Sequence, residues 1–360
     1  MSSTMSILVV NPGSTTTKLG LFENDTQKAV KKIDHPVSEL EKFPKILDQY
    51  DLRRRVMLDF LAEHKVKPES LSAVVGRGGL LKPVPSGTYR VVPKMIEDLN
   101  ASTYGEHASN IGAILAYGFE WDYKIPAFVV DPVVVDEFHD LARFSGLKEL
   151  PRRSIWHALN AFAVTRQTCR TNNWDFRKEN FVTTHLGGGI SVVAIEKGRA
   201  IDVSNALEEG PFTPERAGGI PTLELVKMCF SGKYSHSEVK KILCGSGGLV
   251  NYLGTSNAIE VEKRIAQGDD YAHLVFSAMA YQIAKTIGSY VAVLKGKVKS
   301  IILTGGMAHG KDFTGRITEY VSSFAPVIVV PGEDELGALA QGALRVLRKE
   351  EDARDYNAVP

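Results

Sequence analysis

The chain has 360 residues, a formal net charge of +1 and 24% charged residues. This length exceeds what one ordinary core holds and predicts two domains. The balanced charge, with no long basic run, argues against nucleic acid or a membrane surface as a partner.

The cysteines and the apolar stretches point to a reducing compartment without a membrane span. Three cysteines lie far apart in the sequence and form no Cys-x-x-Cys pair, which argues against a disulfide framework or a zinc site. The longest apolar stretch, residues 127–135, is interrupted by Asp131 and is too short to cross a bilayer. No signal peptide is recognised, so we expect a cytoplasmic protein.

A hairpin is predicted within residues 7–22. Residues 7–10 are a run of Ile, Leu and Val typical of a buried strand, residues 11–13 break it, and Leu19 and Leu21 alternate as in a second strand. The tip offers a glycine, hydroxyls, free amides and a lysine, which together suit an oxyanion such as phosphate. A solvated turn uses the same residue types. The candidate phosphate-binding residues are Gly13, Ser14, Thr15, Thr16 and Lys18.

The next elements are a helix and a strand that ends in a glycine-rich turn. The helix is predicted over residues 54–64, and residues 53–55, three arginines, are expected on its solvated face. The strand, residues 71–75, runs into Gly76-Arg77-Gly78-Gly79, the place where an α/β sheet puts its ligands. A helix at residues 107–120 and a strand at 125–130 follow, and that strand ends at Asp131.

The second half of the chain repeats this order. Residues 181–195 form another strand, small-residue tip and strand, with His185-Leu186-Gly187-Gly188-Gly189-Ile190-Ser191 as the tip. A strand at 298–303 ends in a glycine turn at 304–310, as the strand before Arg77 does. A helix at 317–324 and a strand at 326–330 complete the second copy, and this copy carries a long insertion between its hairpin and its glycine turn.

The chain is predicted to end in a helix at residues 336–347, with a frayed charged tail at 349–360.

Two phosphate-suited hairpins on a duplicated unit resemble the pattern of the acetate and sugar kinase, Hsp70 and actin superfamily. Asn11-Pro12-Gly13-Ser14-Thr15-Thr16-Thr17-Lys18 resembles the amino-terminal signature of the acetokinase family.

Other motifs extend the resemblance over nearly the whole chain, in order. They are Gly76-Arg77-Gly78-Gly79, His107 with Asn110, Asp131, Arg152-Arg153 with His157, the tip at residues 185–191, Arg216 and the turn at Gly305. Within the family, the motifs Gly-Arg-Gly-Gly-Leu-Leu and His-Leu-Gly-Gly-Gly-Ile-Ser are most similar to those of butyrate and branched-chain fatty acid kinases. Acetate and propionate kinases are the alternative.

The resemblance implies a duplicated ribonuclease-H-like, or actin-like, α/β fold with two domains and an active-site cleft. Residues 1–155 with a carboxyl-terminal helix at 334–360 are expected as the first domain. Residues 156–333 are expected as the second, with the nucleotide site and the interface of a homodimer or larger homo-oligomer. An actin-like or Hsp70-like ATPase switch is an alternative from another class, and a sugar kinase is disfavoured because an alcohol acceptor needs a base.

The implied reaction is reversible phosphoryl transfer between ATP and a short-chain carboxylate, giving ADP and an acyl phosphate. The acceptor is already ionised at neutral pH, so the protein needs cations and hydrogen-bond donors rather than a base. The resemblance implies catalytic roles for Arg77, Asp131, His157 and Arg216.

Three further sets of residues are implied by the same resemblance. Arg77, His107 and Arg216 are expected to bind the acyl substrate, and residues near Val92 and 133–135 are candidate walls of its pocket. Mg²⁺ or Mn²⁺ is expected at Asn11, Asp334 and Glu335. The candidates for nucleotide binding in the second copy are His185, Gly187, Gly188, Gly189, Gly305, Gly306, Met307 and His309. A structural salt bridge of Arg216 to Glu215, and helix-terminal roles for the acidic residues, are the alternatives.

Overall fold

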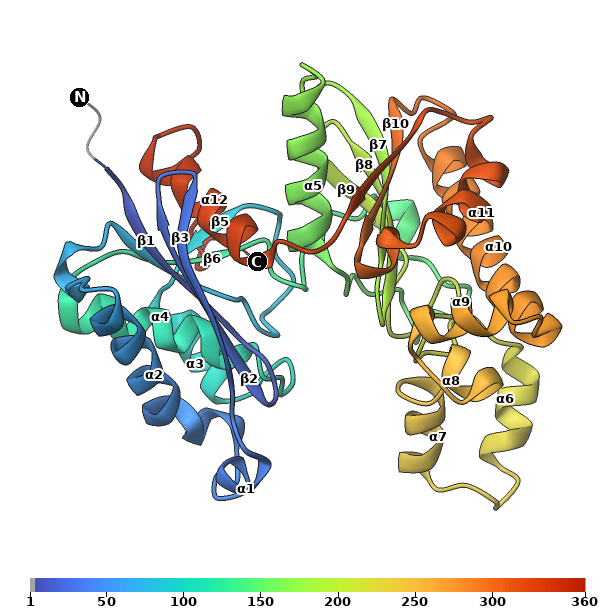
Figure 1. The fold of residues 1–360 in the computed structure, drawn as a ribbon, viewed down its shortest axis with the longest axis horizontal. Helices are drawn as coiled ribbons and strands as arrows, with labels where there is room; N and C mark the ends of the chain where they lie inside the picture. The colour runs from blue at the N-terminus through green and yellow to red at the C-terminus, as the bar shows by residue number, and fades with distance from the viewer. Residues whose placement is uncertain (1–3, 360) are drawn as a thin grey trace. The chain divides into compact units, whose positions relative to one another are not determined.

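Residues 4–359 are described by a computed structural model, which divides into two compact units (Figure 1). Unit 1 comprises Met1–Asp136 and Asp334–Pro360, and unit 2 comprises Glu137–Glu333. Each unit has its own sheet and its own hydrophobic core. The expected roles of the second domain in nucleotide binding and in forming a homo-oligomer interface stay predictions.

The sheet of unit 1 has the strand order β3-β2-β1-β4-β6-β5. Its central strands pair in parallel and are buried along their length, as expected for runs of Val, Ile and Leu covered on both faces. β1, β2 and β3 form an antiparallel meander. The strands are β1 (Ser6–Pro12), β2 (Thr16–Glu23), β3 (Thr26–Asp34), β4 (Ala73–Gly76), β5 (Thr88–Arg90) and β6 (Ala127–Val130).

The sheet of unit 2 repeats this topology. Its strand order is β11-β10-β7-β8-β9, so each strand corresponds to one of β6-β4-β1-β2-β3, with antiparallel and parallel pairs in the same places. The predicted duplication and fold class are therefore confirmed. The strands are β7 (Asn180–Leu186), β8 (Ile190–Glu196), β9 (Arg199–Val203), β10 (Ser300–Gly305) and β11 (Val327–Pro331).

Among the helices of unit 1, α4 and α12 pack most extensively against the sheet. α4 packs against β4 through two glycines: a Cβ at Gly76 would lie 2.1 Å from the carbonyl oxygen of Gly112. This close approach fixes the start of the turn that carries Arg77. The helices are α1 (Val37–Leu40), α2 (Tyr50–Glu63), α3 (Pro93–Asn100), α4 (Asn110–Tyr123) and α12 (Glu335–Leu347).

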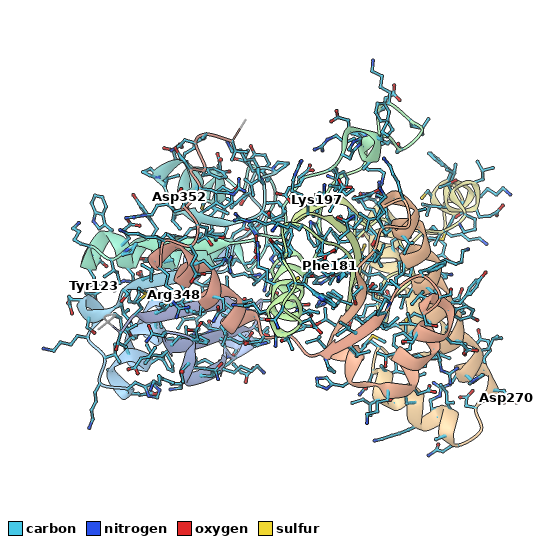
Figure 2. All side chains as sticks on the ribbon, turned by 90° about the horizontal axis from the view of Figure 1, so that it is seen from above. Tyr123, Phe181, Lys197, Asp270, Arg348 and Asp352 are labelled. Atoms are coloured by element: carbon cyan, nitrogen blue, oxygen red, sulfur yellow. The ribbon has the colours of Figure 1, made fainter. Side chains whose placement is uncertain are left out.

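The helices of unit 2 include the long insertion predicted from the sequence. α10 buries one face along its length, with Phe276, Met279 and Ile283 in the core. In Figure 2, Phe181 marks the buried β7 and Lys197 an exposed turn after β8. The helices are α5 (Ala158–Thr171), α6 (Thr222–Cys229), α7 (His236–Leu243), α8 (Gly248–Leu253), α9 (Ala258–Ala266), α10 (Asp270–Val293) and α11 (Lys311–Val321).

The last helix is α12 (Glu335–Leu347), as predicted over residues 336–347, and the wider helical span of 334–360 is too long. The expectation of a frayed tail is wrong. The tail after it is anchored to unit 1: Arg354 exchanges backbone hydrogen bonds with Thr88 and Arg90, and Tyr356 is fully buried and donates to Asp98 at 2.8 Å. Burial of one large aromatic side chain outweighs the polarity of its neighbours.

The arginines of α2 also differ from the expectation. Arg55 is exposed and Arg54 pairs with Asp122, but Arg53 is fully buried. Between residues 4 and 359, no helix combines the length and hydrophobicity needed to cross a membrane.

Candidate active site

The tip between β1 and β2 is open to solvent at its polar side chains. Ser14, Thr15 and Lys18 are exposed, and Gly13 closes the turn by donating from its amide to the carbonyl of Thr16 at 2.9 Å. Within residues 4–359, no protein group accepts a hydrogen bond from the amide of Ser14 or Thr15. The tip can therefore offer donors to an anion.

Unit 1 brings three of the predicted residues together. The carboxylate of Glu335, at the start of α12, accepts a hydrogen bond from the Asn11 amide at 2.6 Å and forms an ion pair with Arg77. Arg77 and Glu335 are both largely buried, with side-chain exposures of 14% and 23%. Arg77 is held by a carboxylate in this structure, which is a contact that the sequence did not predict.

Asp334 has a different position from its neighbour Glu335. It is the N-cap of α12, where its carboxylate accepts from the amide of Gly337 at 2.8 Å. This is the helix-terminal role that we gave as the alternative. The geometry distinguishes the two acidic residues that the sequence left equivalent: Glu335 lies with Asn11 and Arg77, and Asp334 caps the helix.

Asp131 and His107 lie in ordered local structures of unit 1. Asp131 is buried at the end of β6, has a φ of 37°, and is tied to Gly87, whose amide donates to its carboxylate at 2.6 Å. His107 precedes α4 and its Nδ1 contacts the Ser109 hydroxyl at 2.7 Å. Desolvation and, second, the charge of Arg77 lower the pKa of His107, so its neutral form is favoured.

In unit 2 two histidines are stacked beside the glycine-rich tip. The rings of His157 and His185 lie 4.0 Å apart between centroids and are nearly parallel, at 11°. His157 precedes α5 and its Nδ1 contacts the Ser191 hydroxyl at 2.8 Å. His185, buried at the end of β7, contacts Asn160 through Nδ1 at 2.8 Å. Strand pairing places His185 opposite Ser191, the residue that contacts His157. The hairpin tip therefore brings the two histidines together.

Arg216 packs on this tip. Its guanidinium lies so close to Gly189 that a Cβ there would be 2.3 Å from Nη1. Nη1 donates to the carbonyl of Ala206 at 2.7 Å, and burial lowers the pKa of Arg216. Among residues 4–359 no carboxylate forms an ion pair with Arg216, so the alternative of a salt bridge to Glu215 is wrong. Its charge remains available to a ligand.

A hydroxyl that the sequence analysis missed orders the loop of Arg216. Thr213 donates from Oγ1 to the carbonyl of Gly188 at 2.6 Å and accepts from the amide of Arg216 at 3.1 Å. It therefore joins the loop to the tip. Its signal in the sequence was weak, because Thr213-Pro214 reads as an ordinary turn.

The glycine turn after β10 lies beside the same tip. Gly305 has a φ of 95°, and a Cβ there would lie 2.3 Å from the carbonyl oxygen of Leu186, so only glycine fits. Its backbone pairs with Gly332, which brings Glu333 close: the Glu333 carboxylate lies 3.3 Å from Nε2 of His185. Glu333 was not predicted, although it follows a strand in the way that Asp131 does.

A pocket of about 500 Å³ adjoins these elements, within the size range of small-molecule sites. Ile259, which is exposed, and Met307 contribute apolar surface, and the buried rings of Phe276 and Phe313, with centroids 4.6 Å apart, lie beneath it. Several predicted nucleotide-binding residues line it: Gly187, Gly188, Gly306, Met307 and His309. The structure thus brings most of this predicted set around one cavity.

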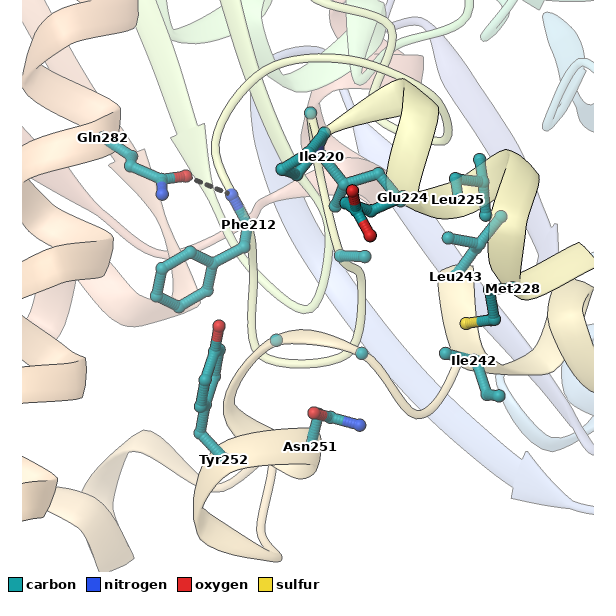
Figure 3. Close-up of a pocket in the computed structure, with 15 residues that line it drawn as sticks. Phe212, Ile220, Glu224, Leu225, Met228, Ile242, Leu243, Asn251, Tyr252 and Gln282 are labelled. Carbon is teal, nitrogen blue, oxygen red and sulfur yellow. Dashed lines mark hydrogen bonds between the residues drawn. The ribbon is translucent and has the colours of Figure 1, made fainter.

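A second pocket in unit 2, of about 380 Å³, contains no predicted site residue (Figure 3). Ile220, Leu225 and Met228 line one part of it, and Phe212 and Tyr252 lie at another, with ring centroids 5.9 Å apart. Its lining is mainly apolar. Nothing in it resembles an anion site.

No group of three or more His, Cys, Asp or Glu side chains suited to a metal occurs within residues 4–359. Asn11 and Glu335 nevertheless bear the oxygen ligands that Mg²⁺ takes, and this ion keeps several waters and needs few protein ligands. The 2.6 Å contact joins the amide nitrogen of Asn11 to Glu335 Oε2, so the side chains are neighbours, and Asn11 would have to turn its amide oxygen toward an ion held by Glu335. The residues present therefore fit such an ion.

The sequence profile of the acetokinase family matches residues 139–318. Among solved structures, acetate kinase from Porphyromonas gingivalis is similar to this chain at 19% identity and a TM-score of 0.76, covering 95% of this chain and 100% of that one. A propionate kinase from Francisella tularensis is similar at 18% identity and a TM-score of 0.72, covering 94% of this chain and 98% of that one.

A third similar structure is acetate kinase from Entamoeba histolytica, at 17% identity and a TM-score of 0.73, covering 94% of this chain and 98% of that one. The duplicated sheets and these structural likenesses define an actin-like ATPase fold. The chain belongs to the acetokinase family. Membership indicates an ATP-dependent phosphotransferase with a carboxyl group as acceptor.

Proposed function

We propose that the protein transfers the γ-phosphoryl group of ATP to a short-chain fatty acid, with butyrate or a branched acid of similar size preferred, and catalyses the reverse reaction. The observation that supports this most is the setting of Arg216, a cation without a carboxylate partner within residues 4–359, packed on a glycine tip beside two stacked histidines. Such a group suits an oxyanion rather than a structural ion pair.

The acceptor chemistry requires little from the protein. A carboxylic acid has a pKa near 4 to 5 and is therefore already ionised at neutral pH, so no general base is needed. One carboxylate oxygen attacks the γ-phosphorus, the bond to the β-γ bridging oxygen breaks, and ADP leaves with that oxygen. Catalysis then consists of alignment and of neutralising charge on the transferring group.

The residues divide these tasks in the proposal. Arg216 and His157 donate to the phosphoryl group as its charge spreads, and Ser191 holds the ring of His157 through Nδ1. Arg77 and His107 receive the carboxylate of the acid, and the hairpin tip at residues 13–18 binds phosphate oxygens through its amides, hydroxyls and lysine. The residues near Val92 and 133–135 stay candidates for the wall around the acyl chain.

The nucleotide is proposed to occupy the pocket of about 500 Å³, with its base against Ile259 and Met307. Asn11 and Glu335 would hold Mg²⁺ or Mn²⁺, which when bound neutralises phosphate charge. Glu335 is favoured over Asp334 because it lies beside Asn11, whereas Asp334 caps α12. The carboxylate of Glu335 also contacts Arg77, so a bound ion would replace one of its present contacts. Homo-oligomerisation and a cytoplasmic location stay predictions.

Acetate or propionate as preferred acceptor is the second candidate, because the solved structures named above are acetate and propionate kinases. Their sequences are less than 20% identical to this chain, so the likeness supports a shared fold but does not identify the preferred acid. Trapping the acyl phosphate with hydroxylamine, using acetate, propionate, butyrate and isobutyrate in turn, decides between them. We expect the highest kcat/KM with butyrate or isobutyrate; a clear preference for acetate would refute that assignment.

An ATPase switch is the alternative from another class. It predicts ATP hydrolysis that does not depend on an added acid, and no hydroxamate with any member of the panel. The phosphotransferase predicts ADP formation that rises with the acid and is matched by hydroxamate.

A further inference from the structure

Three consecutive arginines on α2 lie in three different environments. Arg55 is exposed, Arg54 is partly exposed and pairs with Asp122 at 2.6 Å, and Arg53 is fully buried. A fully buried arginine is uncommon unless its charge is paired. No carboxylate forms an ion pair with Arg53 within residues 4–359, so its partners have to be found elsewhere.

The partners of Arg53 are the backbone carbonyls of the hairpin tip. Nη1 donates to the carbonyl of Thr16 at 2.7 Å, and Nη2 donates to those of Gly13 at 2.9 Å and Ser14 at 3.3 Å. The neutral amide of Gln49, one helical turn earlier, accepts from Nε at 3.0 Å and from Nη2 at 2.8 Å. The planar fork of guanidinium can hold several acceptors at once, which lysine cannot do.

The remaining carbonyl of the tip also points toward the protein. The amide of His35, directly after β3, donates to the carbonyl of Thr15 at 2.8 Å. The four carbonyls of residues 13–16 are therefore all engaged. The amides of Ser14 and Thr15 are left without a protein acceptor among the described residues, at exposed positions.

The Thr17 hydroxyl joins Arg53 to His35. Its Oγ1 accepts from Nη1 of Arg53 at 2.9 Å and lies 2.8 Å from Nε2 of His35. Arginine only donates, so the hydroxyl proton is free to point to the histidine. Burial and, second, the charge of Arg53 lower the pKa of His35, which favours the neutral ring that can accept this proton.

We propose that Arg53 is a positioning residue for phosphate binding: it turns the carbonyl oxygens of the hairpin tip inward, leaves the amides for the phosphate, and places an uncompensated positive charge behind them. This inference rests on the proposed function, in which the tip binds phosphate oxygens. The charge adds to the field of the amides because no carboxylate among residues 4–359 forms an ion pair with it and the Arg53 side chain is itself fully buried.

The test compares Arg53→Lys and Arg53→Ala with Arg55→Lys and Arg55→Ala as matched controls on the same helix. Arg53→Lys keeps the charge and loses the fork. We expect kcat to fall on the order of 10-fold to 100-fold in both Arg53 variants at a temperature well below Tm, with little change in KM for the acid. The Arg55 variants should stay within about 2-fold of the wild type, as is usual for exposed sites.

Methylguanidinium supplies a second readout. Arg53→Ala leaves a buried space of the shape of the lost group, so added methylguanidinium is expected to restore several-fold activity, and methylammonium is expected to restore none. If Arg53→Ala does not fold, Thr17→Val replaces it and should lower kcat in the same direction. A lowered Tm with kcat kept within 2-fold in Arg53→Lys would overturn the proposal, because the role would then be structural.

Nucleotide binding separates this inference from the proposed function. Calorimetry with ATP should show weaker binding in Arg53→Lys than in Arg55→Lys, whether or not an acid is phosphorylated. If the wild type binds ATP and forms no acyl phosphate, the proposed function fails and this comparison still decides the role of Arg53. Equal ATP affinities and equal kcat values would overturn the inference alone.

Discussion

Arg216 is partly buried and packs against the Gly189 backbone, with a carbonyl as its hydrogen-bond partner. Removing it deletes a cation that is already in place before the phosphoryl group moves. We predict that Arg216→Ala lowers kcat on the order of 100-fold to 1,000-fold, the usual effect of losing one preorganised donor, or about 3 to 4 kcal/mol. Arg216→Lys should recover little, since one ammonium cannot replace the fork.

Arg153 provides the control for this prediction. It belongs to the same unit, but it is 64% exposed and pairs with Glu208. Arg153→Ala should leave kcat and Tm nearly unchanged, since exposed pairs contribute little. Steady-state assays of both variants check this; equal losses would mean that Arg216 acts only through the fold.

Cys169 and the two other cysteines should differ in reactivity. Burial raises the pKa of Cys169 to about 11, with smaller contributions from Glu179 and Asp175. At pH 8 only about 0.1% of such a thiol is ionised, and the thiolate is the reactive form. We predict that a thiol reagent modifies Cys229 and Cys244, which are exposed, and modifies Cys169 only after unfolding.

Mass spectrometry of the labelled native protein checks this prediction. Reactivity of Cys169 should rise with pH, because the thiolate population grows as the pH approaches the raised pKa. Rapid labelling of Cys169 in the native protein at pH 8 would contradict its burial.

Candidate site residues were easier to recognise in the sequence than the groups that contact them in the structure. Arg77, His157, His185 and Arg216 stand in recognisable motifs, so their types and order were readable. Burial and contacts come from segments far apart in the chain, and for this reason the pattern did not reveal that Arg53 is buried under the hairpin tip. Glu333 was missed for the same reason, since its neighbour Asp334 has the same chemistry and only the turn decides which carboxylate lies near His185.

At the scale of elements, the turn after β10 depends on glycine. Gly305 has a φ of 95° and no room for a Cβ against Leu186, whereas Gly315 lies inside α11 with open space around it. We predict that Gly305→Ala lowers the free energy of unfolding by about 2 kcal/mol or more, because the backbone must shift. Gly315→Ala should raise it by about 0.5 to 1 kcal/mol through higher helix propensity.

Denaturant unfolding of the two variants measures these changes. The turn borders the proposed nucleotide pocket, so Gly305→Ala should also weaken ATP binding, and Gly315→Ala should not. Equal stability of the two variants would contradict the geometry of the turn.

The edge strands and the tail were harder to predict than the strands of the two hairpins. The strands of both hairpins follow from their apolar runs, but β3 and β9 were not predicted. β3 alternates charged and partly buried residues on an edge, so its sequence is like that of a solvated loop. The tail was predicted to be frayed because it is rich in charged residues. The buried side chain of Tyr356 shows instead that the tail is anchored.

At the scale of the whole molecule, the duplication was the most informative pattern. Order along the chain is preserved in both copies, and the two sheets have matching strand orders. A repeated order of strands and turns can be recognised without knowing any contact, which is why the fold class was predictable. The preferred acid was not, because it depends on the dimensions of a pocket rather than on a motif.

The central claim is direct phosphoryl transfer from ATP to the oxygen of a fatty acid. The most direct test uses butyrate labelled with ¹⁸O in both carboxylate oxygens, with hydroxylamine present. Hydroxylamine attacks the acyl carbon of the acyl phosphate and releases phosphate that keeps the bridging oxygen of the acid. We predict one ¹⁸O atom in each phosphate released; unlabelled phosphate, formed by attack of water on ATP, would contradict the account.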